Sequence, residues 1–122
     1  MNDTLIDTSV LLAPAADRAI LPPGWVVSTI TVGELEAGVL KARDPSVAAS
    51  RLRQLTGVLG EADSLIVDRA VAARYGELRT KTGRSASNDL WIAATALAHD
   101  LVLVTRDSGQ AKLPLIRAEL IS

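Results

Sequence analysis

The chain has 122 residues, a formal net charge of −1 and no cysteine. The missing cysteines exclude disulfides, thiolate zinc sites and cysteine nucleophiles. The near-zero net charge excludes a protein that binds nucleic acid over its whole surface, so any such contact must come from a local basic patch. An aromatic content of 2% excludes a base-stacking platform.

Hydrophobic residues make up 48% of the chain, which argues for a packed domain rather than disorder. The length is near the commonest size of one domain, so we predict a single domain over residues 1–122. The start, residues 1–4, lacks the basic segment of a signal peptide. Apolar runs such as residues 10–16 fall far short of the roughly 20 residues of a membrane span. We therefore expect a cytoplasmic protein without a membrane segment.

Apolar patterning predicts strands that alternate with helices along the chain. Strands are expected over residues 4–7, 25–28, 64–67 and 101–105, with a last edge strand at 115–117, and helices from residue 8 and over 31–43, 45–60, 68–82 and 88–99. Apolar residues at helical spacing support the helices over 31–43 and 45–60: Val32, Leu35, Val39 and Leu40 in the first, and Val47, Leu52, Leu55, Val58 and Leu59 in the second. This alternation predicts an α/β fold in which helices cover both faces of a mainly parallel sheet.

Four acidic residues stand where predicted strands and helices meet, and each has an ordinary structural explanation. Asp7 fits a helix N-cap. Glu34 stands three residues after Thr31, which is the spacing of a capping box. Asp89 lies in the first turn of its helix, where an acid complements the macrodipole. Asp107 is an ordinary turn residue.

The four acids together suggest a second interpretation. Asp7 and Asp107 follow the two most buried strands, so both should emerge at the carboxyl edge of a parallel sheet, where ligands bind. Glu34 and Asp89, near helix N-termini, are placed to flank that edge. Four carboxylates gathered there would raise each other's pKa. Mg²⁺ or Mn²⁺ relieves such repulsion and prefers oxygen ligands. The acids alone leave both interpretations open.

Other phosphate chemistries lack their residues. A single histidine, His99, excludes a metal-free ribonuclease that works through two histidines, and it is a poor base for a serine hydrolase. No Gly-x-x-x-x-Gly-Lys loop is present.

Gly33 and Gly38, on either side of Glu34, suggest close packing of another helix or chain.

Basic side chains stand close in sequence to two of the acids. Arg79, Lys81 and Arg84 precede Asp89, and Arg106 is next to Asp107. These four are candidates for contacts with RNA phosphates. The alternative is a solvated helix surface with ion pairs.

Four segments in this order resemble the PIN domain and, within it, the VapC-type toxins of toxin–antitoxin pairs. They are residues 5–10 (LIDTSV), 28–35 (STITVGEL) with Gly38, 88–96 (NDLWIAATA) and 103–107 (LVTRD). The resemblance implies a three-layer α/β/α sandwich and a ribonuclease dependent on Mg²⁺ or Mn²⁺. It places the family's acidic quartet on Asp7, Glu34, Asp89 and Asp107, with supporting hydroxyls at Ser9 and Thr105.

The resemblance further implies a homodimer held by a cognate antitoxin, whose tail can occupy the catalytic groove. The sequence departs from the family pattern after the last acid. Many similar proteins carry a phenylalanine there, whereas this chain has Gln110-Ala111-Lys112.

The sequence therefore predicts a metal-dependent endoribonuclease that hydrolyses phosphodiester bonds. Asp7, Asp89 and Asp107 are expected to bind the cation directly or through water, and Glu34 to be a ligand or to orient water. A DNA nuclease and a non-catalytic interaction module on the same fold are the alternatives. The chain has no helix-turn-helix pattern, so a regulatory role on DNA is expected only in a complex.

Overall fold

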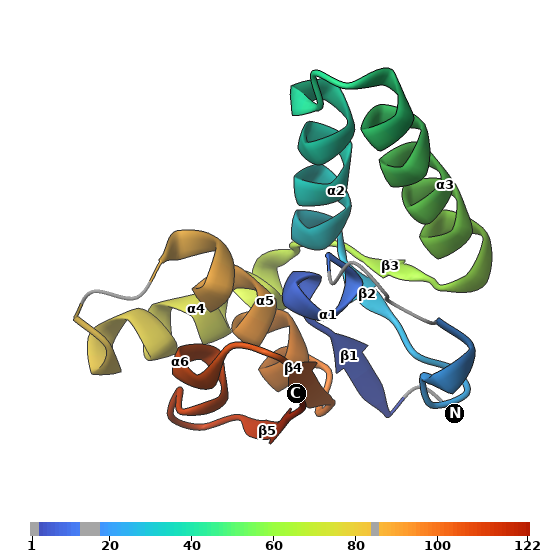
Figure 1. Ribbon diagram of the computed structural model, residues 1–122. Helices are drawn as coiled ribbons and strands as arrows, with labels where there is room; N and C mark the ends of the chain where they lie inside the picture. Colours follow the sequence, from blue (N-terminus) through green and yellow to red (C-terminus); the bar gives the residue numbers. More distant parts are fainter. Residues whose placement is uncertain (1–2, 13–17, 84–85) are drawn as a thin grey trace.

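A computed structural model describes residues 3–12, 18–83 and 86–122 of the chain (Figure 1). The strands are β1 (Thr4–Ile6), β2 (Val27–Ser28), β3 (Ser64–Leu65), β4 (Val102–Thr105) and β5 (Arg117–Leu120). The helices are α1 (Thr8–Leu11), α2 (Thr29–Lys41), α3 (Pro45–Glu61), α4 (Arg69–Lys81), α5 (Ser87–Ala98) and α6 (Ser108–Ala111), with a 3-10 turn η1 (Arg18–Ile20).

Every pairing between these strands is parallel. One group has the order β1-β4-β5 and the other pairs β2 with β3. A parallel bridge between Leu5 and Val26 joins them, with the Ile6 N–H donating to the Val26 carbonyl at 2.9 Å. The strands therefore follow one another in the order β3-β2-β1-β4-β5, and the prediction of a mainly parallel sheet is confirmed.

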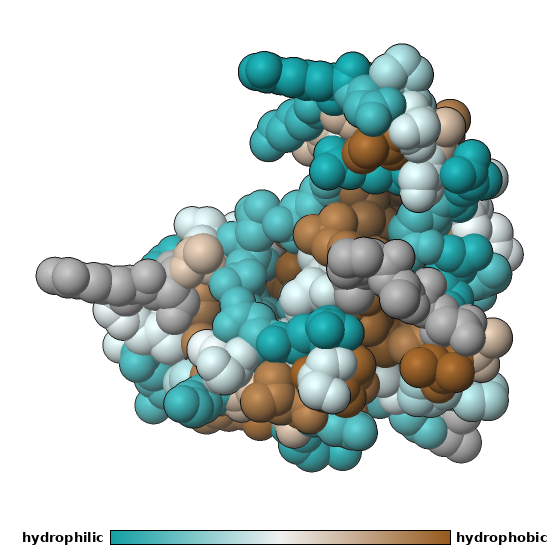
Figure 2. All heavy atoms as spheres, in the orientation of Figure 1, coloured by the Kyte–Doolittle hydropathy of each residue, from teal (hydrophilic) through white to brown (hydrophobic). Residues whose placement is uncertain are grey.

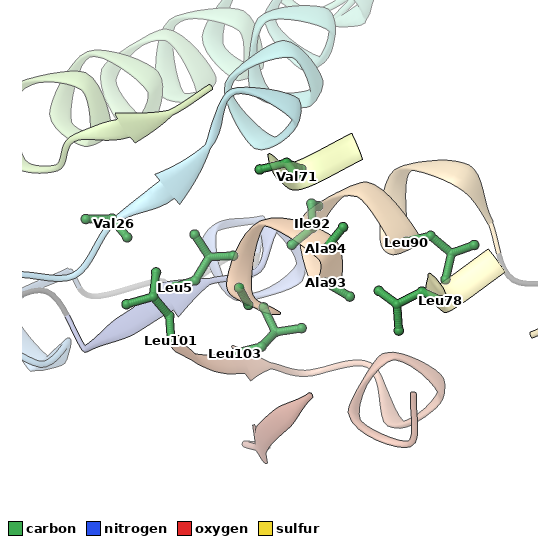
Figure 3. Packing of buried hydrophobic residues seen from close by; sticks show 11 residues of the cluster. Leu5, Val26, Val71, Leu78, Leu90, Ile92, Ala93, Ala94, Leu101 and Leu103 are labelled. Carbon is green, nitrogen blue, oxygen red and sulfur yellow. The ribbon is translucent and has the colours of Figure 1, made fainter. Parts of the chain in front are cut away.

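The two central strands send alternate side chains to opposite faces of the sheet. Leu5 pairs with Leu103 and Ile6 pairs with Val104, and successive residues of a strand point to opposite sides. Leu5 and Leu103 pack with side chains of α4 and α5, as Figure 3 shows. Ile6 and Val104 pack with side chains of α1, α2 and α3. Helices therefore cover both faces, and the predicted α/β/α sandwich is confirmed.

Aspartate caps explain two of the helix starts that the sequence predicted. Asp44 accepts a hydrogen bond from the Ser46 N–H at 2.9 Å at the start of α3, and Pro45 fills its first position. Asp68 accepts one from the Val71 N–H at 3.0 Å at the start of α4. A cap supplies an acceptor for a backbone N–H that has no partner inside the helix.

Other predicted boundaries are wrong by a few residues. α2 starts at Thr29 and not at Thr31, because the Ser28 hydroxyl accepts the Ile30 N–H at 3.0 Å and caps the helix earlier. β3 ends at Leu65 and not at residue 67, since the two apolar residues that follow are exposed. The last strand begins at Arg117, because Leu115 has a φ of 72°, which interrupts an extended chain.

The apolar residues at helical spacing in α2 and α3 are only partly buried. Leu35, Leu55 and Val58 are buried, and Val32 and Val39 pack against them. Four other residues of this pattern are exposed: Leu40 at 86%, Val47, Leu52 and Leu59. α2 and α3 lie side by side and rise from the sheet (Figure 1), and the molecular surface is hollowed between this hairpin and the part built from α4 to α6 (Figure 2).

A membrane-spanning helix was not expected. Within the described part of the chain, no helix is both long enough and apolar enough to cross a membrane.

Candidate metal centre

Asp7 follows β1 directly and is held by hydroxyl groups from two segments. Its side chain is 3% exposed. Its Oδ2 atom accepts hydrogen bonds from the Ser9 N–H at 3.3 Å, the Ser9 hydroxyl at 2.6 Å and the Thr105 hydroxyl at 2.9 Å. The first bond makes Asp7 the N-cap of α1, as expected. The two hydroxyl bonds fix the direction in which the carboxylate points.

Asp107 is tied to the same hydroxyl groups from the end of β4. Its backbone N–H donates to the Thr105 hydroxyl at 3.0 Å, and the Arg106 N–H donates to the Ser9 hydroxyl at 2.9 Å. Thr105 thus connects the segments that carry Asp7 and Asp107, and the two acids lie at one edge of the sheet. Residues 107–109 do not form a simple turn as predicted, because the Asp107 carboxylate caps the short helix α6.

Glu34 contacts α1 from the second turn of α2. Its Oε1 atom accepts a hydrogen bond of 2.6 Å from the Thr8 hydroxyl, which lies 2.8 Å from the hydroxyl of Thr31. The capping-box interpretation of Glu34 is wrong, because Ser28 and not Thr31 is the N-cap. Glu34 is oriented by the residue next to Asp7 rather than by its own helix terminus.

Asp89 lies in the first turn of α5, and its pKa is raised in the folded protein. Burial raises the pKa of Asp89 first, and the negative charges of Asp7, Asp107 and Glu34 raise it further. The four carboxyl groups are therefore near enough to act on one another. They come from α5 and from residues at or near the starts of α1, α2 and α6.

The oxygen atoms of these acids fit a hard cation. Asp7 uses Oδ2, Asp107 uses Oδ1 and Glu34 uses Oε1 in the hydrogen bonds above, whereas their second oxygens accept none from the described residues. The Asp89 carboxylate accepts none at all from the described residues. Carboxylate oxygens are the ligands that Mg²⁺ and Mn²⁺ prefer.

These oxygens are not gathered into a closed set of ligands. In residues 3–12, 18–83 and 86–122, no three Asp, Glu or His side chains are arranged so that they could hold an ion as they stand. Mg²⁺ commonly keeps several waters and is bound through only one or two carboxylates. The donor chemistry therefore fits such an ion, with bridging waters to complete its ligands.

The basic candidates divide into three kinds. Arg79 is already engaged, because its guanidinium donates to the Tyr75 hydroxyl at 3.0 Å and to the Ser87 hydroxyl at 3.3 Å, and it lowers the pKa of Tyr75. Lys81 and Arg106 are exposed. Arg84 lies outside the described residues.

Sequence reasoning missed three residues that contact the acid-bearing segments. Thr8 and Thr31 orient Glu34, and the Gln110 side chain donates to the Asp89 carbonyl at 2.9 Å. A polar residue inside a predicted helix carries no sequence signal for a partner on another element. The only available signal was the position of Thr8 beside Asp7.

The chain is similar to known proteins along nearly its whole length. Residues 4–115 match the PIN domain family. Ribonuclease VapC4 of Mycobacterium tuberculosis is 37% identical over 118 residues, covering 90% of each chain. The solved VapBC-5 complex from Mycobacterium tuberculosis contains a chain with a TM-score of 0.78 and 33% identity, covering 98% of this chain and 97% of that one. A chain of FitAcB from Neisseria gonorrhoeae has a TM-score of 0.73 and 30% identity, covering 94% and 95%.

A profile match over nearly the whole length defines the class of protein, and the relatives define the group within it. The chain belongs to the PIN domain family and, within it, to the VapC-type toxins.

Proposed function

We propose that this chain is an endoribonuclease dependent on a divalent metal ion and the toxin of a toxin–antitoxin pair. Relatives that share more than a third of their residues with it over most of their length are named as ribonucleases. The observation that carries the proposal is the hydrogen-bond network that brings Asp7 and Asp107 together at one sheet edge, with Glu34 held beside Asp7 by Thr8. The charges of these three acids also raise the pKa of Asp89. Such a concentration of negative charge is unfavourable unless a cation compensates it.

In this proposal, Asp7, Asp89 and Asp107 hold Mg²⁺ or Mn²⁺ directly or through water, and Glu34 is a further ligand or orients water. When bound, the ion supplies a water of lowered pKa and stabilises charge on the phosphate. Ser9 and Thr105 keep Oδ2 of Asp7 in hydrogen bonds to the protein, which would leave its other oxygen available to an ion. Thr8 does the same for Glu34.

Contacts with the RNA backbone fall on the basic candidates that stand close in sequence to Asp89 and Asp107. We assign them to Arg106, Lys81 and Arg84, since Arg79 is bound to Tyr75 and Ser87 and contributes mainly by holding the start of α5. Neutralising a phosphate releases counterions, so each such contact should weaken with salt.

The proposal includes partners and location. Solved structures similar to this chain are toxin–antitoxin complexes, which supports a cognate antitoxin as the partner. We further propose a homodimer, one domain over residues 1–122 and a cytoplasmic location, where the RNA substrate occurs. Gly33 has nothing within 4 Å of the position of an added Cβ, so close packing at this glycine would need another chain.

The test is incubation of purified protein with total cellular RNA, with and without Mn²⁺, and mapping of the ends produced. Cleavage that needs Mn²⁺ and stops with a chelator is expected. Labelled RNA and DNA of one sequence separate the alternatives. Cleavage of DNA alone would identify a DNA nuclease, and no cleavage of either would leave a non-catalytic interaction module.

The first prediction is that Asp7→Asn abolishes cleavage while the fold remains. The amide retains one oxygen that can accept from Ser9 and Thr105, but it removes the negative charge that a cation needs. We expect the cleavage rate to fall by at least about 100-fold. Gel assays of RNA cleavage measure the loss, and circular dichroism verifies the fold. A variant that cleaves at the wild-type rate contradicts the assignment of Asp7.

A further inference from the structure

Gln110 lies on α6 and contacts two of the acid-bearing segments. Its side chain is 2% exposed. Its Nε2 atom donates a hydrogen bond of 2.9 Å to the backbone carbonyl of Asp89, and its backbone N–H donates one of 3.3 Å to Oδ1 of Asp107. One residue therefore bonds to both acids, through a side-chain amide on one side and a main-chain amide on the other.

The other end of the Gln110 amide has no partner. Oε1 is the only buried side-chain nitrogen or oxygen without a hydrogen bond within the described part of the chain. A buried acceptor without a partner destabilises the folded protein, because the oxygen has lost its hydrogen bonds to water. An apolar side chain of similar size would avoid this cost. A glutamine at this position therefore does not serve the stability of the fold. Its use is explained by the hydrogen bond that Nε2 of the same amide donates to the Asp89 carbonyl.

The Nε2 group acts on a helix turn that has no side-chain cap and is otherwise held by Arg79, which donates to the Ser87 hydroxyl at 3.3 Å. The N-cap of α5 is Ala86, which makes no side-chain capping bond. Asp89 lies in the turn that follows, so no cap orders this acid-bearing turn from its own helix. Two groups of residues carry the acids here: the first turn of α5 with Asp89, and the residues Asp7, Ser9, Thr105 and Asp107 with α6. Among the described residues, the bond from Gln110 is the only hydrogen bond between these two groups.

We propose that Gln110 is a positioning residue that fixes Asp89 relative to Asp107 and thereby sets the affinity of the centre for a divalent cation. This inference rests on the proposed function, because it assumes that these acids bind the ion. Without the Gln110 bond, the first turn of α5 keeps its contact with Arg79 but loses its hydrogen bond to the Asp107 segment. The negative charges of Asp7, Asp107 and Glu34 can then displace Asp89 from the other acids. The cation then has to order this turn when it binds, and its affinity falls.

The test compares Mn²⁺ binding by wild type and Gln110→Met, measured by titration calorimetry. Methionine has a similar length and fills the site without a donor or an unpartnered oxygen. We expect Kd for Mn²⁺ to rise by about 10-fold, the usual effect of removing a residue that orients a ligand. We expect the melting temperature of the metal-free protein to stay equal or rise. A purely structural residue would lower the melting temperature and leave Kd unchanged.

Gln54→Met is the matched control. Gln54 also donates from Nε2 to a backbone carbonyl, that of Leu11 at 2.8 Å, but it lies on α3 and contacts none of the four acids. Its replacement should leave Kd for Mn²⁺ unchanged. Equal Kd values for Gln110→Met and wild type, or an equal rise in both glutamine variants, would overturn the proposal.

A metal-free measurement separates this proposal from the proposed function. Hydrogen exchange of the Leu90 and Trp91 amides should be faster in Gln110→Met than in wild type when a chelator is present. If wild type binds no Mn²⁺, the metal centre itself is wrong, whatever the exchange shows. If wild type binds Mn²⁺ and neither Kd nor exchange changes in the variant, only the role of Gln110 is wrong.

Discussion

The hydroxyl of Thr105 lies between two segments from opposite ends of the chain. It donates to the Asp7 carboxylate and accepts the Asp107 backbone N–H. The sequence predicted that both acids emerge at one sheet edge, because each follows a buried strand. The family resemblance placed supporting hydroxyls at Ser9 and Thr105, but a threonine at the end of a strand carries no sign of which atoms it contacts. The position of each acid was therefore predictable, and the orientation of its carboxylate was not.

Asp89 yields the second prediction, which concerns pH. Its raised pKa means that the folded protein favours the neutral carboxyl. The neutral carboxyl contributes to the free energy of unfolding in full below the ordinary aspartate pKa of about 3.9. This contribution is lost as the pH rises through the raised pKa of the folded protein. At neutral pH the ionised group therefore destabilises the metal-free protein. Asp89→Asn should stabilise it by about 0.5 kcal/mol, a small value because solvent screens a partly exposed group.

Thermal unfolding in a chelator from pH 4 to pH 7 measures this effect. The melting temperature of Asp89→Asn should exceed that of wild type by roughly 2 °C at pH 7, and the difference should disappear towards pH 4. Glu36→Gln is the control, because Glu36 is exposed and is not among the groups that shift Asp89. A difference that grows as pH falls would contradict the explanation.

Capping residues decided how well the elements could be predicted. Asp44-Pro45 and Asp68 act as the local rules require, and the helices that follow them begin as predicted. Ser28 and Thr31 are both acceptable caps three residues apart, and the sequence offers no local means of choosing between them. The structure uses Ser28, which is fully buried at the end of β2. The choice depends on where the strand ends, which is a tertiary property.

The third prediction compares two glycines of α3. An ideal Cβ on Gly57 would lie 2.1 Å from the guanidinium of Arg18, which is bound to Glu61 at 2.8 Å and also to Gln54. An added Cβ on Gly60 meets nothing within 4 Å. Alanine is favoured over glycine in helices by about 1 kcal/mol. Gly60→Ala should therefore stabilise the protein by about 0.5 kcal/mol, since Gly60 lies in the last turn.

Gly57→Ala should stabilise the protein less than Gly60→Ala does, or should destabilise it. The reason is that Arg18 must move and lose its contacts with Glu61 and Gln54. Urea unfolding of both variants gives the comparison. The double variant Arg18→Ala with Gly57→Ala is the control, since alanine at position 57 should be favourable once the guanidinium is gone. If Gly57→Ala alone is as stabilising as Gly60→Ala, the contact between Arg18 and α3 is not important.

At the scale of the whole molecule, the alternation of strands and helices was sufficient to predict the layers. The pattern did not show which apolar residues are buried by another element of the fold. Leu40 and Leu52 continue the helical spacing of α2 and α3 but are exposed, because no other element of the described chain reaches the outer surface of this hairpin. Periodicity marks an apolar helix face, whereas burial depends on how far the rest of the fold extends.

The last prediction joins the site to the stability of the molecule. An ion that binds the folded chain and not the unfolded one stabilises it by RT ln(1 + [L]/Kd), about 2.7 kcal/mol at 100 times Kd. For a domain of this size, the melting temperature should then rise by roughly 10 °C. Mn²⁺ should produce this rise in wild type and a chelator should reverse it. In Asp7→Asn the rise in melting temperature should be lost, because the four-acid group then lacks the negative charge of Asp7. Glu36→Gln should keep the rise, since its charge lies outside the quartet. An equal rise in all three proteins would mean that Mn²⁺ binds elsewhere, and the four acids would then have structural roles alone.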